Sequence, residues 1–143
     1  EVNYSYPKGV RAFMAQRQQR RCHNENSDYL LGTKGRGEIA RSIFTENAKG
    51  RWSYDGKREN MYQIEHNELF ESIRAGKPIN NGDRMALSTM MAIMGRTAAY
   101  TGKEITYEQI LNAKEDRYPK DMNWRTGKHT PPPLAKPGLT PFV

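Results

Sequence analysis

Residues 60–76 read NMYQIEHNELFESIRAG, and this stretch has a clear helical period. Asn60 is a residue type that caps the start of a helix, while Gly76 ends the pattern and Pro78 prevents its continuation. Between them, five side chains recur at the spacing of one helix face: Tyr62, His66, Leu69, Phe70 and Ile73. The stretch therefore predicts an amphipathic helix.

Two more helices are expected further along the chain. Asp83 is predicted to cap a helix that runs to about Tyr100 and ends at Gly102. Its buried stripe is expected to contain Leu87, Met90, Met91, Met94 and Ala98. Thr106 and Gln109 have the spacing of a capping box, which predicts the start of a short third helix.

The first third of the chain is typical of β-strands separated by turns. Residues 10–17 mix apolar and polar side chains so that one face is mostly apolar and the other has an arginine at each end. Shorter strands are expected at 29–31, at 39–44 and around Trp52 and Tyr54. Ile39 and Ile43 lie four residues apart, which leaves a helix open for that segment. Strands followed by helices predict an α+β fold, with a mostly antiparallel open sheet and the helices packed on one face.

The composition narrows the class of protein. A chain of 143 residues has the length of one domain, and its 8 Tyr, 7 Met, 4 Phe and 2 Trp can build a core that disordered chains usually lack. A single cysteine, Cys22, excludes a disulfide scaffold. No apolar run approaches the roughly 20 residues that a bilayer requires, so no membrane partner is expected.

The chain is expected to divide into a folded part and a tail. Residues 1–113 hold the α+β pattern, and residues 114–143 are expected to form an extended, proline-rich C-terminal tail. Because the sequence starts at Glu1 and no signal segment follows, we expect a chain that is processed or cut from something longer.

Motifs that carry chemistry are sparse. Gly32, Gly35 and Gly37 have the reverse of the dinucleotide-binding spacing, and no long helix follows, so a tight turn between strands is favoured. The three histidines do not stand at metal-ligand spacing, so no metal site is expected. Cys22 has arginines nearby but no histidine–acid pair, which favours a structural thiol.

His66 is the one candidate site residue. It lies on the apolar stripe of the first predicted helix, with Glu65 and Glu68 nearby. A histidine in such a position is most often a core residue whose ring nitrogens are satisfied by backbone or a carboxylate. The alternative is a substrate-cleft residue that faces a neighbouring domain. No catalytic, cofactor-binding or metal-binding residue is assigned.

Residues 17–21, RQQRR, form the densest basic segment of a chain with 23 Lys+Arg, 16 Asp+Glu and a net charge of +7. Such a charge attracts polyanions. Acidic residues are dispersed throughout, however, and no base-reading helix or aromatic RNA-binding motif is present, so nucleic acid is not the expected partner. The alternative function kept open is a stand-alone basic module that binds nucleic acid or another polyanion through Arg11, Arg17, Arg20 and Arg21.

Four segments occur in an informative order: GTKG at 32–35, EHNELFESIRAGKPINNG at 65–82, TAAYTGKEIT at 97–106 and KPGLTPFV at 136–143. Together they resemble the C-terminal part of the glucose–fructose oxidoreductase and inositol dehydrogenase family, Gfo/Idh/MocA. The resemblance implies a bacterial two-domain enzyme that transfers hydride between a sugar or polyol and NAD or NADP. It also implies that this chain is the C-terminal substrate-binding and oligomerisation domain.

The resemblance defines what is expected of cofactor and partners. NAD or NADP belongs to the full-length protein, on an N-terminal Rossmann domain, and no cofactor is expected in this chain. The expected partners are that missing domain, further copies of the chain and, in the full-length protein, a sugar or polyol substrate. The isolated chain is expected to be inactive, and both cytoplasm and periplasm remain open as its compartment.

The chain also departs from the family pattern. The family's catalytic Glu-Lys-Pro motif is absent, and Gly76-Lys77-Pro78 follows a different helix. The family's Asp-x-x-x-His pair has no match, because Gln19, Tyr62 and Arg125 stand four residues before the three histidines. These elements are expected upstream of the chain, and no catalytic residue is carried over from the family.

Overall fold

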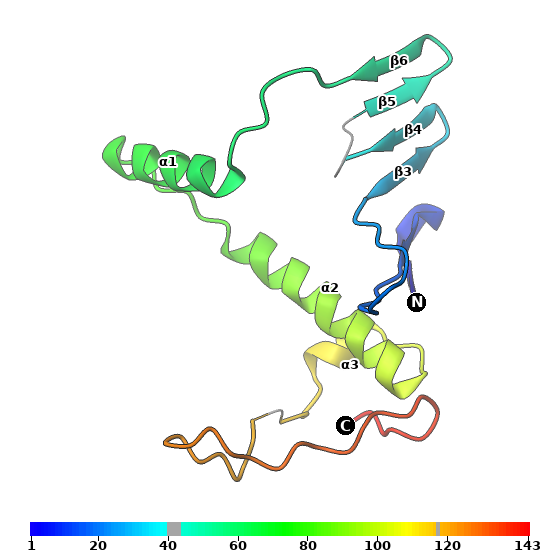
Figure 1. Cartoon of the computed structure of the whole chain (residues 1–143), viewed down its shortest axis with the longest axis vertical. Helices are drawn as coiled ribbons and strands as arrows, with labels where there is room; N and C mark the ends of the chain where they lie inside the picture. Colours follow the sequence, from blue (N-terminus) through cyan, green and yellow to red (C-terminus); the bar gives the residue numbers. More distant parts are fainter. Residues whose placement is uncertain (40–43, 117) are drawn as a thin grey trace. The chain divides into compact units, whose positions relative to one another are not determined.

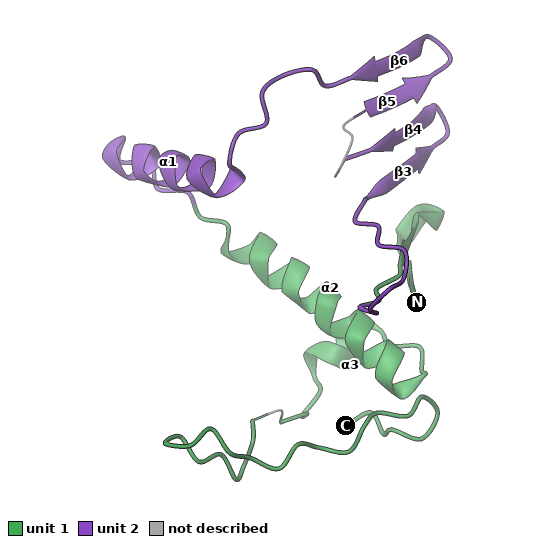
Figure 2. Ribbon diagram, viewed as in Figure 1, with its two compact units in different colours: residues 1–17, 80–143 green, residues 18–79 purple. Residues whose placement is uncertain are grey.

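The computed structural model describes residues 1–39, 44–116 and 118–143, and these ranges form an α+β protein. They contain a four-stranded and a two-stranded antiparallel sheet and three α-helices (Figure 1), which confirms the α+β class and the antiparallel pairing predicted from the sequence. The chain divides into two compact units, shown in Figure 2. We call residues 18–79 the sheet unit and residues 1–17 with 80–143 the α2 unit.

The sheet unit contains the four-stranded sheet in the order β3-β4-β5-β6, with every neighbouring pair antiparallel. Its strands are β3 (Tyr29–Gly32), β4 (Gly35–Glu38), β5 (Phe44–Asn47) and β6 (Gly50–Ser53). The strands predicted at 29–31 and around Trp52 are confirmed. The prediction for 39–44 falls mostly outside the described residues, since 40–43 are among those left undescribed and Phe44 begins β5. Strand β4 was not predicted, because its three-residue pattern Gly-Arg-Gly lacks strand-forming side chains.

The register of the sheet separates its side chains into two faces. Side chains alternate along a strand, and directly opposite residues share a face. One face, which we call the glycine face, contains Leu30, Gly32, Gly35, Gly37, Thr45, Asn47, Gly50 and Trp52. The other, which we call the charged face, contains Tyr29, Leu31, Arg36, Glu38, Phe44, Glu46, Arg51 and Ser53. The two faces of the sheet therefore differ in the residues they carry: one has no charged residue and the other has four.

Helix α1 (Met61–Arg74) also belongs to the sheet unit and confirms the helix predicted from residues 60–76. The side-chain oxygen of Asn60 accepts a hydrogen bond from the backbone N–H of Tyr62 at 3.0 Å, so Asn60 is the N-cap. Gly76 follows the helix with a φ of 68°, a conformation that glycine adopts without steric cost. The helix has no buried residue, so its predicted apolar stripe is present but exposed.

The α2 unit is built on a short hairpin and a long helix. Strands β1 (Val2–Ser5) and β2 (Arg11–Met14) pair antiparallel and are joined through the 3₁₀ turn Pro7–Gly9. Helix α2 (Gly82–Thr101) packs against β1 and against α3 (Tyr107–Leu111). Strand β2 confirms part of the strand predicted at 10–17, whereas β1 was not predicted from the sequence.

The ends of α2 agree only in part with the prediction from the sequence. Gly102 ends the helix in the left-handed conformation at φ 69°, as predicted. At the other end the N-cap position is occupied by Asn81, so the prediction of Asp83 as the cap is wrong. Asp83 lies in the first turn, where its carboxylate interacts favourably with the positive end of the helix dipole.

The buried side of α2 differs from the predicted methionine stripe. Gly95, Thr97 and Thr101 are the buried residues, while Leu87 and Met91 are exposed. Gly95 is covered because the ring of Tyr4 lies against it, where a Cβ would meet the hydroxyl. Around Thr101, the C-terminal segment crosses the helix end, and the Gly138 N–H donates to the Thr101 carbonyl at 2.7 Å. Packing partners distant in sequence, rather than hydrophobicity, therefore determine the buried side.

Helix α3 begins with the predicted capping box. The Thr106 hydroxyl accepts from the Gln109 N–H at 3.2 Å, and the Gln109 side chain accepts from the Thr106 N–H at 2.9 Å. Ile110 of this helix is buried, and with Val2 it is one of two buried large apolar side chains among the described residues. The core of the α2 unit is therefore small and lies between β1, α2 and α3.

Candidate functional site

The candidate site residue His66 lies in the middle of α1 and is exposed. Its Nδ1 lies 2.6 Å from the carbonyl oxygen of Tyr62, one turn earlier in the helix. Because a carbonyl only accepts, Nδ1 carries the proton in this contact, and the Nε2 of the neutral ring is left as an acceptor. The structure thus gives His66 a backbone partner, and it presents one ring nitrogen on the exposed surface of α1.

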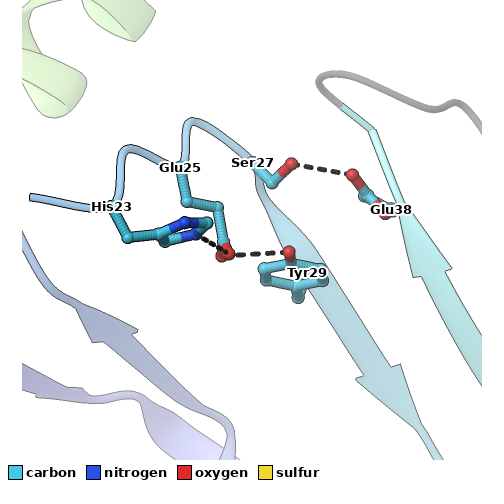
Figure 3. Close-up of polar contacts among 5 residues, drawn as sticks. All are labelled: His23, Glu25, Ser27, Tyr29 and Glu38. Atoms are coloured by element: carbon cyan, nitrogen blue, oxygen red, sulfur yellow. Dashed lines mark hydrogen bonds and ion pairs between the residues drawn. The ribbon is translucent and has the colours of Figure 1, made fainter.

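A polar cluster joins the loop before the four-stranded sheet to strands β3 and β4 (Figure 3). The Tyr29 hydroxyl donates to Glu25 at 3.0 Å, and Nε2 of His23 lies 3.5 Å from the other carboxylate oxygen. The Ser27 hydroxyl donates to Glu38 at 2.7 Å. The hydrogen bond to Glu25 raises the pKa of Tyr29 above its ordinary value, because the phenol proton is held by a carboxylate.

The polar cluster fixes the loop onto the sheet, because Tyr29 and Glu38 are cross-strand partners and each contacts a loop residue. This arrangement was not predicted from the sequence. The available signal was the spacing of Glu25, Ser27 and Tyr29, which places three polar side chains on one side of an extended chain.

The charged face of the sheet is internally paired. Arg36 contacts Glu46 on the next strand through Nη2 at 2.7 Å and Nε at 2.8 Å. The guanidinium of Arg51 lies 4.1 Å from the centre of the Phe44 ring, within the range of a cation–π contact. Tyr29 and Leu31 are exposed on the same face, so it combines paired charges with exposed apolar side chains.

The glycine face is flat in its middle and apolar at its margins. Trp52 and Leu30, both more than half exposed, stand on the two edge strands, with Gly37 and Thr45 between them in the same cross-strand row. A Cβ on Gly37 would lie 3.0 Å from the Phe44 carbonyl oxygen, so a larger residue there would require the neighbouring strand to shift by a few tenths of an ångström. A flat, uncharged sheet face with exposed aromatic and aliphatic side chains is suited to contact with another protein surface.

The glycine pattern at 32–37 is a hairpin rather than a phosphate-binding loop. Gly32 and Gly35 are paired across a two-residue turn formed by Thr33 and Lys34, and Gly37 continues in β4. The predicted tight turn between strands is confirmed, and the segment does not lead into a helix N-terminus.

A groove of about 1130 Å³ lies within the α2 unit. It is lined by residues 1–7, by side chains of α2 that include Leu87, Met91 and Met94, and by residues 102–107. The Tyr4 hydroxyl donates to the Met91 carbonyl at 3.0 Å, and burial raises the pKa of Tyr4. The groove combines an apolar floor with one strand as a wall.

The remaining predicted features lie in the loop between β2 and β3. This loop contains Arg17, Arg20 and Arg21, with Arg21 at a positive φ of 62°, and the half-buried free thiol of Cys22. In the ranges described here, no group of three or more His, Cys, Asp or Glu side chains is arranged to hold a metal ion. Nor does any helix in those ranges have the length and apolar character needed to cross a membrane.

Comparison with known proteins gives no relative: no family model, curated protein or solved structure matches the chain.

Proposed function

We propose that this chain is the substrate-binding and association domain of an NAD(P)-dependent sugar or polyol oxidoreductase similar to the Gfo/Idh/MocA family. Support comes from the ordered segments that resemble that family and from an α+β fold with a mostly antiparallel sheet, the architecture that the resemblance implies. In this proposal the chain contributes surfaces, and a separate cofactor-binding domain holds the nicotinamide.

The observation that carries the association role is the exposed area. The chain exposes 13602 Å². A compact monomer of 16.5 kDa exposes about 7,500 Å², and two separate compact bodies of half that mass would expose about 9,000 Å². The excess of at least about 4,500 Å² is several times the roughly 800 Å² that each partner buries in a standard interface. Exposure of this size favours a chain that is covered by large partner surfaces.

Part of the exposed area consists of large apolar side chains on α1 and on the glycine face. On α1, Tyr62, Phe70 and Ile73 are each more than half exposed. On the glycine face, Leu30 and Trp52 are similarly exposed, and no charged side chain belongs to that face. Exposed apolar side chains of this kind are typical of protein–protein contact sites.

The proposal that a separate domain binds the cofactor is tested by measuring the binding of nicotinamide nucleotides to this chain. Isothermal titration calorimetry of the chain with NAD and with NADP is expected to give no binding at micromolar concentrations, because the cofactor domain is a separate body in this proposal. A full-length Rossmann dehydrogenase titrated in parallel serves as the positive control. Micromolar affinity of the chain for either nucleotide would contradict the proposal.

The role of His66 is tested in the longer protein. If the upstream coding sequence encodes a Rossmann domain with a G-x-G-x-x-G motif, the protein that contains both domains is expected to oxidise a sugar or polyol. In that protein, His66→Ala is expected to raise KM more than it lowers kcat. Asn67→Ala, at the next position of the exposed helix, is the matched control. Unchanged kinetics in the His66 variant would remove His66 from the substrate cleft.

A further inference from the structure

The groove of the α2 unit runs along one edge of strand β1. All four residues of β1 line it, whereas no residue of β2 does. A groove that contacts a whole strand but not its hairpin partner lies on the side of β1 that faces away from β2. Within the described ranges, β2 is the one strand that pairs with β1.

The hydrogen-bond pattern identifies which main-chain groups point into the groove. The Tyr6 N–H donates to the Val10 carbonyl at 2.9 Å, at the turn end of the hairpin. In an antiparallel pair, bonded positions alternate, so Tyr4 and Val2 also bond to β2. The N–H and C=O groups of Asn3 and Ser5 therefore point outward, along the groove. They form the edge that a further strand would complete.

The groove floor is apolar and would contact the side chains on one face of such a strand. Val2 and Tyr4 turn toward the buried side of the α2 unit, where Val2 is only 9% exposed, while Asn3 and Ser5 are exposed. Beside them, Met91 and Met94 of α2 provide an apolar, adaptable surface. A strand added next to β1 would therefore place alternate side chains on α2 and the others in water.

We propose that this groove accepts an extended segment of another polypeptide as a third strand beside β1, with aliphatic residues at alternate positions facing α2. The groove volume of about 1130 Å³ exceeds the roughly 300–1,000 Å³ of small-molecule sites. Its charged lining is confined to Glu1, Lys103 and Glu104, which favours an occupant that is uncharged in its middle. Main-chain pairing supplies the affinity, and the methionine floor selects the side chains.

This inference does not depend on the oxidoreductase assignment, since it rests on β1 and α2 alone. If the chain were found to bind NAD, the proposed function would fail and the strand site would be untouched. If the strand site failed, the exposed glycine face and α1 would still support the association role.

The test uses the whole chain and a synthetic probe, an acetylated and amidated hexapeptide of alternating threonine and valine. Amide hydrogen exchange is measured by nuclear magnetic resonance with and without the peptide. Strand addition is expected to slow exchange at Asn3 and Ser5 by about tenfold, while Tyr4, already bonded to β2, changes less. No slowing at Asn3 and Ser5, at any peptide concentration that remains soluble, would overturn the proposal.

Two controls separate strand addition from simple apolar binding. The same peptide with an N-methyl group on every residue has no peptide N–H to donate, and its methyl groups prevent close approach of either edge to β1, so it is expected not to protect Asn3 or Ser5. Asn3→Pro removes one outward N–H and leaves the β1–β2 bonds intact, so it is expected to weaken peptide binding by about tenfold. Asn3→Ala keeps that N–H and is expected to bind normally. Equal effects of both peptides, or normal binding by Asn3→Pro, would also overturn the proposal.

The floor is tested by a matched pair of methionine variants. Met94 lines the groove, whereas Met85, on the same helix, is exposed and lies outside it. Met94→Lys is expected to weaken peptide binding by about tenfold and Met85→Lys to leave it unchanged, because only the first places a charge on the apolar floor. Equal binding by the two variants would contradict the proposed orientation of the strand.

Discussion

Single glycines lie at the places where segments distant in sequence come into contact. Gly95 allows the ring of Tyr4 to lie against α2, and Gly102 combines a left-handed helix end with close approach of the C-terminal segment. A Cβ on Gly102 would lie 2.9 Å from the Gly138 nitrogen. These glycines are therefore explained by packing and not by a phosphate or nucleotide, which a glycine-rich sequence can otherwise suggest.

The contact between Gly95 and Tyr4 predicts that Gly95→Ala changes the stability of the chain in opposite directions with and without the Tyr4 ring. Gly95→Ala is expected to destabilise the chain by about 1–3 kcal/mol, because the new methyl displaces Tyr4 from α2. In a Tyr4→Ala background, the same substitution is expected to stabilise the chain by about 0.5–1 kcal/mol, since alanine is the better helix former. Urea unfolding of the four proteins measures both steps. The same sign in both backgrounds would show that Tyr4 is not the obstacle.

The polar cluster leads to a prediction about pH. The pKa of Tyr29 is raised in the folded chain by its hydrogen bond to Glu25. The stabilisation from this bond is present below the ordinary tyrosine pKa of about 10 and is lost as the pH rises through the folded-state value. Glu25→Gln is expected to lower the pKa of Tyr29 toward its ordinary value, measured by carbon NMR of labelled tyrosine rings. Glu65→Gln, on α1, is the control, and an unchanged Tyr29 in the Glu25 variant would contradict the contact.

At the element scale, α1 and α2 are stabilised to different degrees. Helix α1 has 14 residues and none is buried, whereas α2 has 20 residues and packs against β1 and α3. Isolated helices of about 12–15 residues are marginal in water, since most helical stability in proteins comes from packing. Helix α1 therefore depends on its Asn60 cap and on whatever surface covers its apolar stripe.

This difference is measurable by hydrogen exchange in the chain diluted until light scattering shows the monomer, so that association does not cover α1. Amides in the middle of α1 are expected to exchange at least about tenfold faster than those around Gly95 and Thr97 in α2. Asn60→Ala is expected to speed exchange in α1 further and leave α2 unchanged, because it removes a cap worth about 1 kcal/mol. Equal protection of the two helices would mean that α1 is already stabilised by packing.

Local signals in the sequence predicted the elements that they encode and missed those that depend on partners. Asn60, Thr106 and Gly102 act through backbone groups within four residues of them, so their roles were readable from the sequence. Strand β4 was missed because its side chains carry little strand preference and its pairing with β3 and β5 defines it. The buried side of α2 was missed because Tyr4 and Gly138 cover it from positions far along the chain.

The candidate site was less predictable than the fold. His66 was singled out from its position on the stripe, and the sequence could not supply its contact with the Tyr62 carbonyl. The groove beside β1 was not foreseen at all, since it requires β1 to be recognised as a strand and placed against α2. Sites formed by segments 80 or more residues apart, such as Tyr4 and Met91, leave no local pattern in the sequence.

At the scale of the whole molecule, the balance of charge distinguishes association from polyanion binding. The chain has a net charge of +7, yet its charged face is neutralised by pairs such as Arg36 with Glu46. Specific association through apolar surfaces depends little on salt, whereas phosphate binding weakens steeply as salt rises.

This contrast gives a test of the alternative function. Filter binding of single-stranded DNA is expected to show no retention at physiological ionic strength, since attraction from dispersed charges is screened there. The triple variant Arg17→Ala, Arg20→Ala, Arg21→Ala is expected to change nothing at that salt concentration. Retention that falls steeply with added salt and is lost in the triple variant would instead support the basic binding module.

The most direct test of the association role is the mass of the chain in solution. Light scattering across a concentration series is expected to show a species of at least about 33 kDa, twice the 16.5 kDa of one chain, because the exposed apolar surfaces of α1 and the glycine face are covered by association. A species that stays at 16.5 kDa up to the highest soluble concentration would contradict the account.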